Sequence, residues 1–364
     1  MSASPLERLA IPIIQAPMWG ASTLEMALAV SRAGGMGQLA AAGLGPDQIT
    51  ASVAELRSAT DQPFALNFLM SEPVRPEADA VEAALARLKP WYDARGIELP
   101  AIPNDYAQDF AAQLEAVIRA APPAASFAFS ILTAPQIAAL RARDIYVIGT
   151  ATTVAEARAW VAVGADAVCA QGSEAGGHRG TFLAPVEDSL IGTMALVSTV
   201  RRAVPVPVIA AGGIMDGRGV AAALALGAAA AQMGSAFLLA DQSMASPPWR
   251  RAIVEAPDDS TRLTSAFSGR YARGIENDFM RQMRPIEAEI PAYPIQNRLT
   301  AQLRSAATKA EDTSVMSLWA GQAVKLAEPG DAGALVQRWW AEAKTVAQEV
   351  AARTGEPERA PKAK

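Results

Sequence analysis

Eight short apolar runs recur along this chain, and segments with helical periodicity separate most of them. Most runs are apolar at consecutive positions, which is typical of parallel strands buried on both faces. The predicted strands are Ile11–Ala16, Met36–Ala40, Phe64–Leu69, Ser126–Ser130, Ile145–Ile148, Ala167–Gln171, Val206–Ala210 and Ala229–Met233. The predicted helices between them are Thr23–Ala33, Pro46–Ser58, Pro135–Arg141, Thr153–Val163, Val186–Ala203 and Gly217–Leu226.

The number of predicted strands indicates a closed barrel. Eight parallel strands with intervening helices match the (β/α)8 TIM barrel, an α/β fold. An open, doubly wound sheet is the alternative, because it shows the same local alternation of strands and helices. The chain has 364 residues, of which 51% are hydrophobic, and is long enough to bury one large core.

Two long segments interrupt the alternation. The first, at about 71–125, follows the third strand and contains two predicted helices, Glu77–Leu88 and Tyr106–Ala120. The second follows the eighth strand and is expected to extend over the barrel mouth. The expected division is a barrel domain over 1–240 with a helical insertion at about 71–125, a smaller substrate or lid region over 241–325, a C-terminal helix packed on the barrel over 326–352, and a disordered tail over 353–364.

Net charge and hydropathy exclude some classes of partner. A net charge of −5 and a pI near 5.2 provide no basic field for nucleic acid. No segment reaches the ~20 apolar residues of a membrane span, and the N-terminal residues lack the apolar region of a secretion signal. We therefore expect a cytoplasmic monomer or homodimer whose partners are small molecules.

The chain has one cysteine and one histidine, Cys169 and His178. This excludes an internal disulfide, a multi-cysteine zinc site and a multi-histidine centre. Glu174 is the one carboxylate among the predicted strand ends, so no metal is expected. No lysine precedes Lys89 or lies between Lys89 and Lys309, which excludes a Schiff-base lysine on a strand. Because Cys169 lies in an apolar run, we expect an inert thiol.

Glycine-rich turns follow the seventh and eighth predicted strands. Gly212-Gly213 and Gly234-Ser235 stand at the carboxyl ends of these strands, where barrels hold phosphate groups. Backbone N–H groups bind the phosphate oxygens, and glycine lets the phosphate approach closely. Ordinary tight turns are the alternative for each pair. Two such pairs on adjacent strands favour a phosphate-bearing ligand.

Two carboxamides, Asn67 and Gln171, stand at strand ends of the same barrel mouth. A carboxamide offers both a donor and an acceptor, which suits the edge of a flavin ring. An ordinary polar strand end is the alternative for each of them. Together with the glycine-rich turns, these amides favour a flavin carrying a phosphate group.

The only histidine lies in the segment QGSEAGGHRG, directly after the sixth predicted strand. Glycines around it leave little side-chain bulk, so a substrate can approach closely. These glycines are Gly176, Gly177 and Gly180. Imidazole titrates near neutral pH, and this position predicts a general base at His178. Arg179 either holds an anionic substrate or is a surface charge, and Glu174 is expected to support the loop.

These segments resemble the nitronate monooxygenases, formerly called 2-nitropropane dioxygenases, and in particular class I of that family. The resemblance runs from about residue 11 to about residue 345. Its most specific segment is QGSEAGGHRG at 171–180, whereas PVIAAGGI at 207–214 also occurs in other flavin barrels. The other matching segments are IIQAPM at 13–18, QMGS at 232–235, FSGR at 267–270, YPIQNRLT at 293–300 and LWAGQ at 318–322.

The resemblance implies a barrel enzyme that binds flavin mononucleotide (FMN). Such enzymes oxidise alkyl nitronates, for example propionate 3-nitronate, with O₂ to a carbonyl compound and nitrite. The resemblance places the catalytic histidine on His178, and Trp19, where many relatives have a smaller residue, is expected to narrow the pocket. The expected cofactor-binding residues, from the resemblance and the strand ends together, are Ala16, Pro17, Met18, Asn67, Gln171, Gly176, Gly177, Gly180, Gly212, Gly213, Gln232, Met233, Gly234 and Ser235.

Three other functions fit a flavin barrel. An FMN-dependent NAD(P)H reductase, acting on enoyl thioesters or quinones, is the main alternative, and flavin bleaching by NADH would identify it. An FMN dehydrogenase would need its catalytic cysteine in a loop, whereas Cys169 lies within a predicted strand. A non-catalytic flavin-binding or storage protein is the third alternative.

Overall fold

The computed structural model describes residues 3–71 and 74–354. Its main feature is a parallel sheet of eight strands, in the order β1-β9-β8-β6-β5-β4-β3-β2. A parallel bridge between Ile14 and Met36 joins the two outer strands and closes the sheet. The predicted (β/α)8 barrel is confirmed, and the open sheet is excluded. The strands are β1 Ile13–Gln15, β2 Gly37–Ala40, β3 Phe64–Leu69, β4 Ala124–Ala128, β5 Tyr146–Ala151, β6 Ala167–Gln171, β8 Val208–Ala211 and β9 Ala230–Met233.

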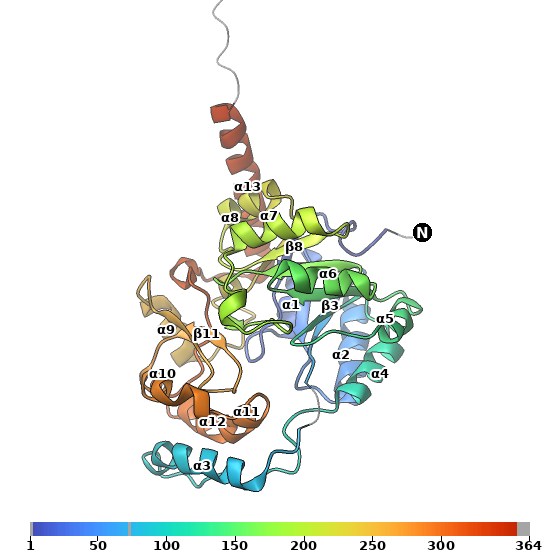
Figure 1. Ribbon diagram of the computed structural model, residues 1–364. Coiled ribbons are helices and arrows are strands. Elements are labelled where there is room, and N and C mark those ends of the chain that lie inside the picture. Colours follow the sequence, from blue (N-terminus) through green and yellow to red (C-terminus); the bar gives the residue numbers. More distant parts are fainter. Residues whose placement is uncertain (1–2, 72–73, 355–364) are drawn as a thin grey trace, which may run out of the picture.

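Within the described residues, a helix follows each barrel strand and packs on the outside of the sheet (Figure 1). The last of these helices, α13, comes long after β9 in the chain, yet it packs against α8 and α1 and so completes the ring. Its C-terminal turns project beyond the barrel in Figure 1. The ring consists of α1 Leu24–Arg32, α2 Pro46–Ala59, α4 Phe110–Ala120, α5 Ala134–Arg141, α6 Val154–Ala162, α7 Thr193–Ala203, α8 Gly217–Ala225 and α13 Ala332–Thr354.

The barrel has an inner and an outer apolar core. Ile14, Ile148, Ile209 and several alanines fill the interior of the barrel, and Cys169 lies among them. A larger cluster, which includes the buried Trp160, fills the space between the sheet and its helices. Small interior side chains and close helix packing explain how a chain with only 6% aromatic residues fills these cores.

A second layer covers the carboxyl ends of the barrel strands and has its own apolar core. The hydroxyl of Tyr92 on α3 donates to the carbonyl of Leu299 on α11 at 2.6 Å, which joins two distant parts of the chain. Figure 1 shows α3 beside α11 and α12, at the end of the molecule opposite α13. The helices of this layer are α3 Ala78–Asp93, α9 Pro247–Glu255, α10 Asp278–Met283, α11 Ile295–Leu299 and α12 Ala301–Lys309. The short 3-10 helices of the chain are η1 Glu187–Ser189, η2 Ser235–Phe237, η3 Arg284–Glu289 and η4 Val324–Leu326.

A small antiparallel sheet, β10-β11-β7, connects the barrel to this layer. It consists of β7 Gly177–His178, β10 Thr261–Thr264 and β11 Ala272–Ile275. His178 pairs with Ala272 of β11. The expectation that His178 lies in a loop is therefore wrong. A strand of two residues has no periodicity, and its partner is far along the chain, so the sequence carried no local signal for it.

Three predicted boundaries shift for identifiable reasons. The fourth strand ends at Ala128, since Phe129 has a φ of +81°, which is outside the β region. The helix predicted from Val186 begins at Thr193, where the carboxylate of Glu174 accepts the backbone N–H at 2.9 Å. The helix predicted from Tyr106 begins after Asp109, which caps its first turn. No helix among the described residues is long and apolar enough to cross a membrane.

Candidate active site

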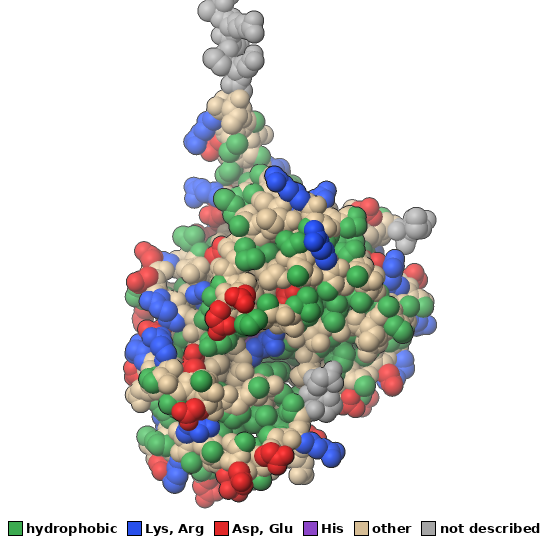
Figure 2. Space-filling model, viewed as in Figure 1, with side chains coloured by type: hydrophobic (Ala, Val, Ile, Leu, Met, Phe, Trp, Pro, Cys, Tyr) green, Lys and Arg blue, Asp and Glu red, His purple; other side chains and the backbone are tan. Residues whose placement is uncertain are grey.

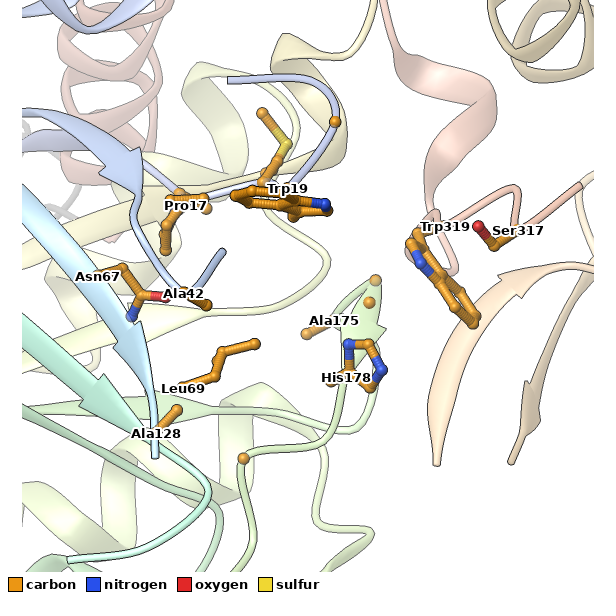
Figure 3. Close-up of a pocket in the computed structure, with 18 of the residues that line it drawn as sticks. Pro17, Trp19, Ala42, Asn67, Leu69, Ala128, Ala175, His178, Ser317 and Trp319 are labelled. Atoms are coloured by element: carbon orange, nitrogen blue, oxygen red, sulfur yellow. The ribbon is translucent and has the colours of Figure 1, made fainter. Parts of the chain in front are cut away.

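A cavity of about 920 Å³ lies between the barrel mouth and the covering layer. Figure 2 shows a hollow between the two layers, and Figure 3 shows Trp19, His178 and Trp319 around the pocket. The volume is near the upper end of the ~300–1,000 Å³ range of ligand pockets, so a cofactor and a substrate fit together. The predicted site residues that line it are Ala16, Pro17, Met18, Asn67, Gln171, Gly176, Gly177, His178, Gly180, Gly212, Gly213, Gln232, Gly234 and Ser235.

Met233 is the predicted site residue that does not line the cavity. Its side chain is fully buried in the core between the sheet and the helices. Successive side chains of a strand point to opposite faces, so Gln232 faces the cavity and Met233 faces outward.

The glycine-rich turns after β8 and β9 present unpaired backbone donors. Gly212 and Gly213 have φ angles of +119° and +69°, which favour glycine. The N–H groups of Gly213 and Gly234 have no acceptor among the described residues. A Cβ at Gly212 would lie 2.7 Å from Thr193 Oγ1, so a side chain would not fit there. Free N–H groups without side-chain bulk fit a phosphate group, as the sequence predicts.

A chain of hydrogen-bonded polar side chains crosses the barrel mouth. Asn67 Nδ2 donates to Ser126 Oγ at 2.9 Å, and Ser126 Oγ donates to Gln38 Oε1 at 3.0 Å. Gln38 Nε2 then donates to Gln232 Oε1 at 2.7 Å. Asn67 Oδ1 and Gln232 Nε2 have no hydrogen-bond partner among the described residues and so are available to a ligand. This pattern fits the edge of a flavin ring, and it depends on Gln38 and Ser126, which the sequence analysis did not select.

Gln171 holds the segment that carries the histidine. Its Nε2 donates to the carbonyl of His178 at 3.0 Å, and its Oε1 accepts the N–H of Gly180 at 2.8 Å. One Nε2 hydrogen and one lone pair of Oε1 remain for a ligand. Gln171 is therefore a support for the histidine as well as a residue of the cavity wall.

His178 is surrounded by aromatic rings at the edge of the cavity. The ring centroids of Trp319, Phe129 and Tyr293 lie 5.4, 5.5 and 6.1 Å from that of the imidazole. Its Nε2 lies 2.8 Å from Ser268 Oγ. Burial, followed by the positive charges of Arg270 and Arg304, lowers the pKa of His178 to about 3. The imidazole is therefore neutral near pH 7, with one of its two ring nitrogens unprotonated.

Arg179, next to the histidine, has a structural role. Its side chain is fully buried and donates to the carbonyl oxygens of Gly172 at 2.6 Å and Ser189 at 3.0 Å. It does not line the cavity. Neither sequence interpretation, a substrate ligand or a surface charge, is correct.

Two arginines line the cavity, Arg298 and Arg304. Arg304, on α12, is the one whose charge acts on His178. Its Nε donates to Thr300 Oγ1 at 3.1 Å, and its Nη2 donates to Asn297 Oδ1 at 2.9 Å. Among the described residues, no carboxylate pairs with Arg304, and its Nη1 has no acceptor. The one carboxylate among the lining residues is Asp105, which is exposed. An unpaired guanidinium at a cavity wall is suited to an anionic ligand.

The buried carboxylate of Glu156 holds the loop that follows the histidine. It accepts hydrogen bonds from the N–H groups of Thr152 at 2.6 Å and Leu183 at 3.1 Å, and from Thr181 Oγ1 at 2.9 Å. Burial opposes ionisation of Glu156, but the hydrogen bonds from Phe182 and its other donors outweigh it and lower the pKa.

We expect the Glu156→Gln variant to be destabilised by about 1–3 kcal/mol at pH 7, because an amide NH₂ would face N–H donors. Glu82→Gln, at an exposed position, is the matched control. The lowered pKa of Glu156 stabilises the native state above its unfolded pKa near 4.5, and this stabilisation is lost as the pH falls through the folded value. Thermal unfolding at pH 7 and pH 4 should therefore show a smaller difference in stability between the unmodified protein and Glu156→Gln at pH 4. An equal difference at both pH values would contradict this role.

The covering layer contributes cavity residues to which the sequence analysis gave no role. They lie in or near the segments YPIQNRLT and LWAGQ, whose resemblance to the family was their only signal. They are Tyr293, Asn297, Arg298, Arg304 and Trp319.

The model of the family described as "Nitronate monooxygenase" matches residues 4–342. The chain belongs to the nitronate monooxygenase family. The probable nitronate monooxygenase of Staphylococcus saprophyticus is 42% identical over 328 residues, which cover 90% of this chain and 92% of the relative. The probable nitronate monooxygenase of Staphylococcus aureus strain Newman is 41% identical over 317 residues, which cover 87% and 89%.

Two solved structures are similar to this chain. A nitroalkane oxidase from Streptomyces ansochromogenes has a TM-score of 0.89 and 41% identity, with 95% of this chain and 100% of that chain covered. FabK from Thermotoga maritima has a TM-score of 0.74 and 29% identity, with 97% and 100% covered. The first match supports both the resemblance found in the sequence and the barrel fold.

Proposed function

We propose that this protein binds FMN and oxidises alkyl nitronates with O₂ to carbonyl compounds and nitrite. The observation that carries the proposal is the position of His178. It faces a cavity that has a glycine rim of free N–H groups and the unpaired Arg304, in a chain of the nitronate monooxygenase family. The names of the relatives and of the nitroalkane oxidase structure support the same chemistry.

The residues present fit the proposed cofactor. Gly212, Gly213, Gly234 and Ser235 would hold the phosphate group of FMN, and Asn67 and Gln232 would contact its ring edge. When bound, FMN supplies the electron-accepting and oxygen-reacting chemistry that amino-acid side chains lack.

The chain itself binds the anion and moves a proton. Arg304 attracts the negative charge of a nitronate, which an unpaired cation in a partly desolvated cavity binds strongly. A neutral nitroalkane must first lose its α-proton, and the neutral imidazole of His178 is the base available to take it. Arg270 and Arg304 repel the imidazolium cation that this transfer creates. The nitronate anion forms beside that cation, and their attraction offsets the repulsion.

A substitution in the glycine rim should weaken cofactor binding. In Gly213→Ala, a Cβ would lie 3.3 Å from Glu174 Cβ, and the +69° φ would be strained. We expect the FMN dissociation constant, measured by fluorescence titration of the apoprotein, to rise by about tenfold, the effect of one charge-assisted hydrogen bond. Gly96→Ala is the control, because Gly96 has a φ of +61° but open space around it. Equal affinity in both variants would contradict the assignment of Gly213 to the phosphate site.

The proposed function is tested by incubating the FMN-loaded protein with propionate 3-nitronate and O₂, with no NADH present. We expect oxygen uptake and release of nitrite. NADH is omitted because the alternative, an NAD(P)H-dependent reductase on the same fold, requires it. No oxygen uptake and no nitrite would refute nitronate oxidation.

A further inference from the structure

Among the described residues, the imidazole of His178 has one hydrogen-bond partner, Ser268. The two residues meet at 2.8 Å between Nε2 and Oγ, and Ser268 is only 1% exposed. Ser268 belongs to FSGR at 267–270, one of the segments that resemble the nitronate monooxygenase family. Its Oγ also donates to the carbonyl of Arg270 at 3.0 Å and accepts the N–H of Arg270 at 3.3 Å.

A serine hydroxyl has one hydrogen and two lone pairs. The carbonyl of Arg270 has no other donor among the described residues, so we assign the Ser268 hydrogen to it, which leaves the Ser268 oxygen as the acceptor for the imidazole. Nε2 of His178 must then carry the hydrogen, and Nδ1 of the neutral ring carries the lone pair. Nδ1 has no partner among the described residues, and His178 lines the cavity, as Figure 3 shows.

The same segment also holds the backbone next to His178. The guanidinium of Arg270 lies 4.0 Å from the centre of the Phe129 ring. Its Nε donates to the carbonyl of Arg179, the residue after His178, at 3.0 Å, and its Nη2 donates to the carbonyl of Thr181. The segment that holds the tautomer therefore also holds the backbone on which the imidazole is mounted.

We propose that Ser268 is a positioning residue that fixes His178 as the Nε2–H tautomer, so that Nδ1 is the atom that takes the proton from a nitroalkane. This inference rests on the proposed function. The α C–H bond of the nitroalkane breaks, its electron pair forms the C=N bond of the nitronate, the N=O π pair moves onto the nitro oxygen, and the proton passes to Nδ1. The imidazolium then keeps its Nε2–H donation to Ser268, and Ser268 keeps its donation to Arg270. No oxidant takes part in this step.

The tautomer can be measured directly, because His178 is the only histidine of the chain. We would label the FMN-loaded protein, without a histidine tag, with ¹⁵N-histidine and record long-range ¹H–¹⁵N correlations. We expect a protonated, pyrrole-type Nε2 and an unprotonated, pyridine-type Nδ1. Ser268→Ala should shift the pattern toward a mixture of tautomers, and Ser268→Thr should preserve it. A protonated Nδ1 in the unmodified protein would overturn the proposal.

Kinetics supply a second, independent test. For Ser268→Ala we expect kcat/KM with nitroethane to fall about five- to tenfold more than kcat/KM with ethyl nitronate, which needs no proton transfer. Ser268→Thr should keep the ratio of the two kcat/KM values, nitroethane to ethyl nitronate, near that of the unmodified protein. Ser265→Ala is the matched control, because the Ser265 hydroxyl, three residues before Ser268, is buried without a hydrogen-bond partner among the described residues. Equal losses with both substrates would overturn the role in proton transfer. The NMR result does not depend on turnover, so a protein that oxidised no nitronate would refute the proposed function alone.

Discussion

Replacing His178 by Asn is expected to lower kcat/KM for neutral nitroalkanes by about 10²- to 10⁴-fold, the usual contribution of a general base. Asn cannot accept the α-proton, whereas the imidazole is neutral and open to the cavity. Turnover of a preformed nitronate should fall much less, because its proton is already gone. FMN should stay bound, since its proposed phosphate contacts lie on the turns after β8 and β9.

The measurement is nitrite release from nitroethane and from ethyl nitronate, with the flavin content determined for each preparation. The ratio of the two rates is the readout, because it cancels errors in the amount of active enzyme. Unchanged activity of His178→Asn on nitroethane would refute the base role. Loss of FMN in this variant would instead make His178 part of the cofactor site.

Arg304→Met is expected to raise KM for nitronates by about 10- to 100-fold, since a hydrogen bond to a charged group contributes roughly 1.5–3 kcal/mol. Methionine keeps much of the side-chain length but removes the charge. The effect should be largest at low salt, because screening weakens the attraction in the unmodified protein. The kcat value should change less, since Arg304 acts on binding of the anion.

Arg251→Met is the matched control, because Arg251 pairs with Glu311 and does not line the cavity. KM should be measured for ethyl nitronate at several ionic strengths in both variants. If KM in Arg304→Met equals that of the unmodified protein at low salt, Arg304 does not bind the anion.

The barrel could be predicted because each of its strands leaves a recognisable pattern in a short stretch of sequence. Each buried strand shows as an apolar run, and residues at the strand ends must meet at one mouth. That rule brought Asn67, Gln171, His178 and Gly213 together without any structure. The same rule wrongly placed Met233 in the cavity wall. In a four-residue strand, the apolar pattern does not show whether a side chain points into the barrel or toward the helices.

The rest of the site depends on contacts that are distant in sequence. Arg304 lines the same cavity as His178 only because α12 folds back over the barrel mouth, and no local pattern predicts that packing. For Arg179 the sequence left two interpretations open, a ligand of an anionic substrate and a surface charge. Its guanidinium instead binds carbonyl oxygens of its own loop, a role that depends on where Gly172 and Ser189 lie.

In the proposed reaction, the electrons that reduce the flavin come from the nitronate. This claim is tested most directly by mixing the FMN-loaded protein, without oxygen, with propionate 3-nitronate or with NADH and following the flavin absorbance. We predict a rapid change of the oxidised flavin spectrum with the nitronate and none with NADH on the same timescale. Rapid bleaching by NADH, with no response to the nitronate, would contradict the claim and indicate a reductase.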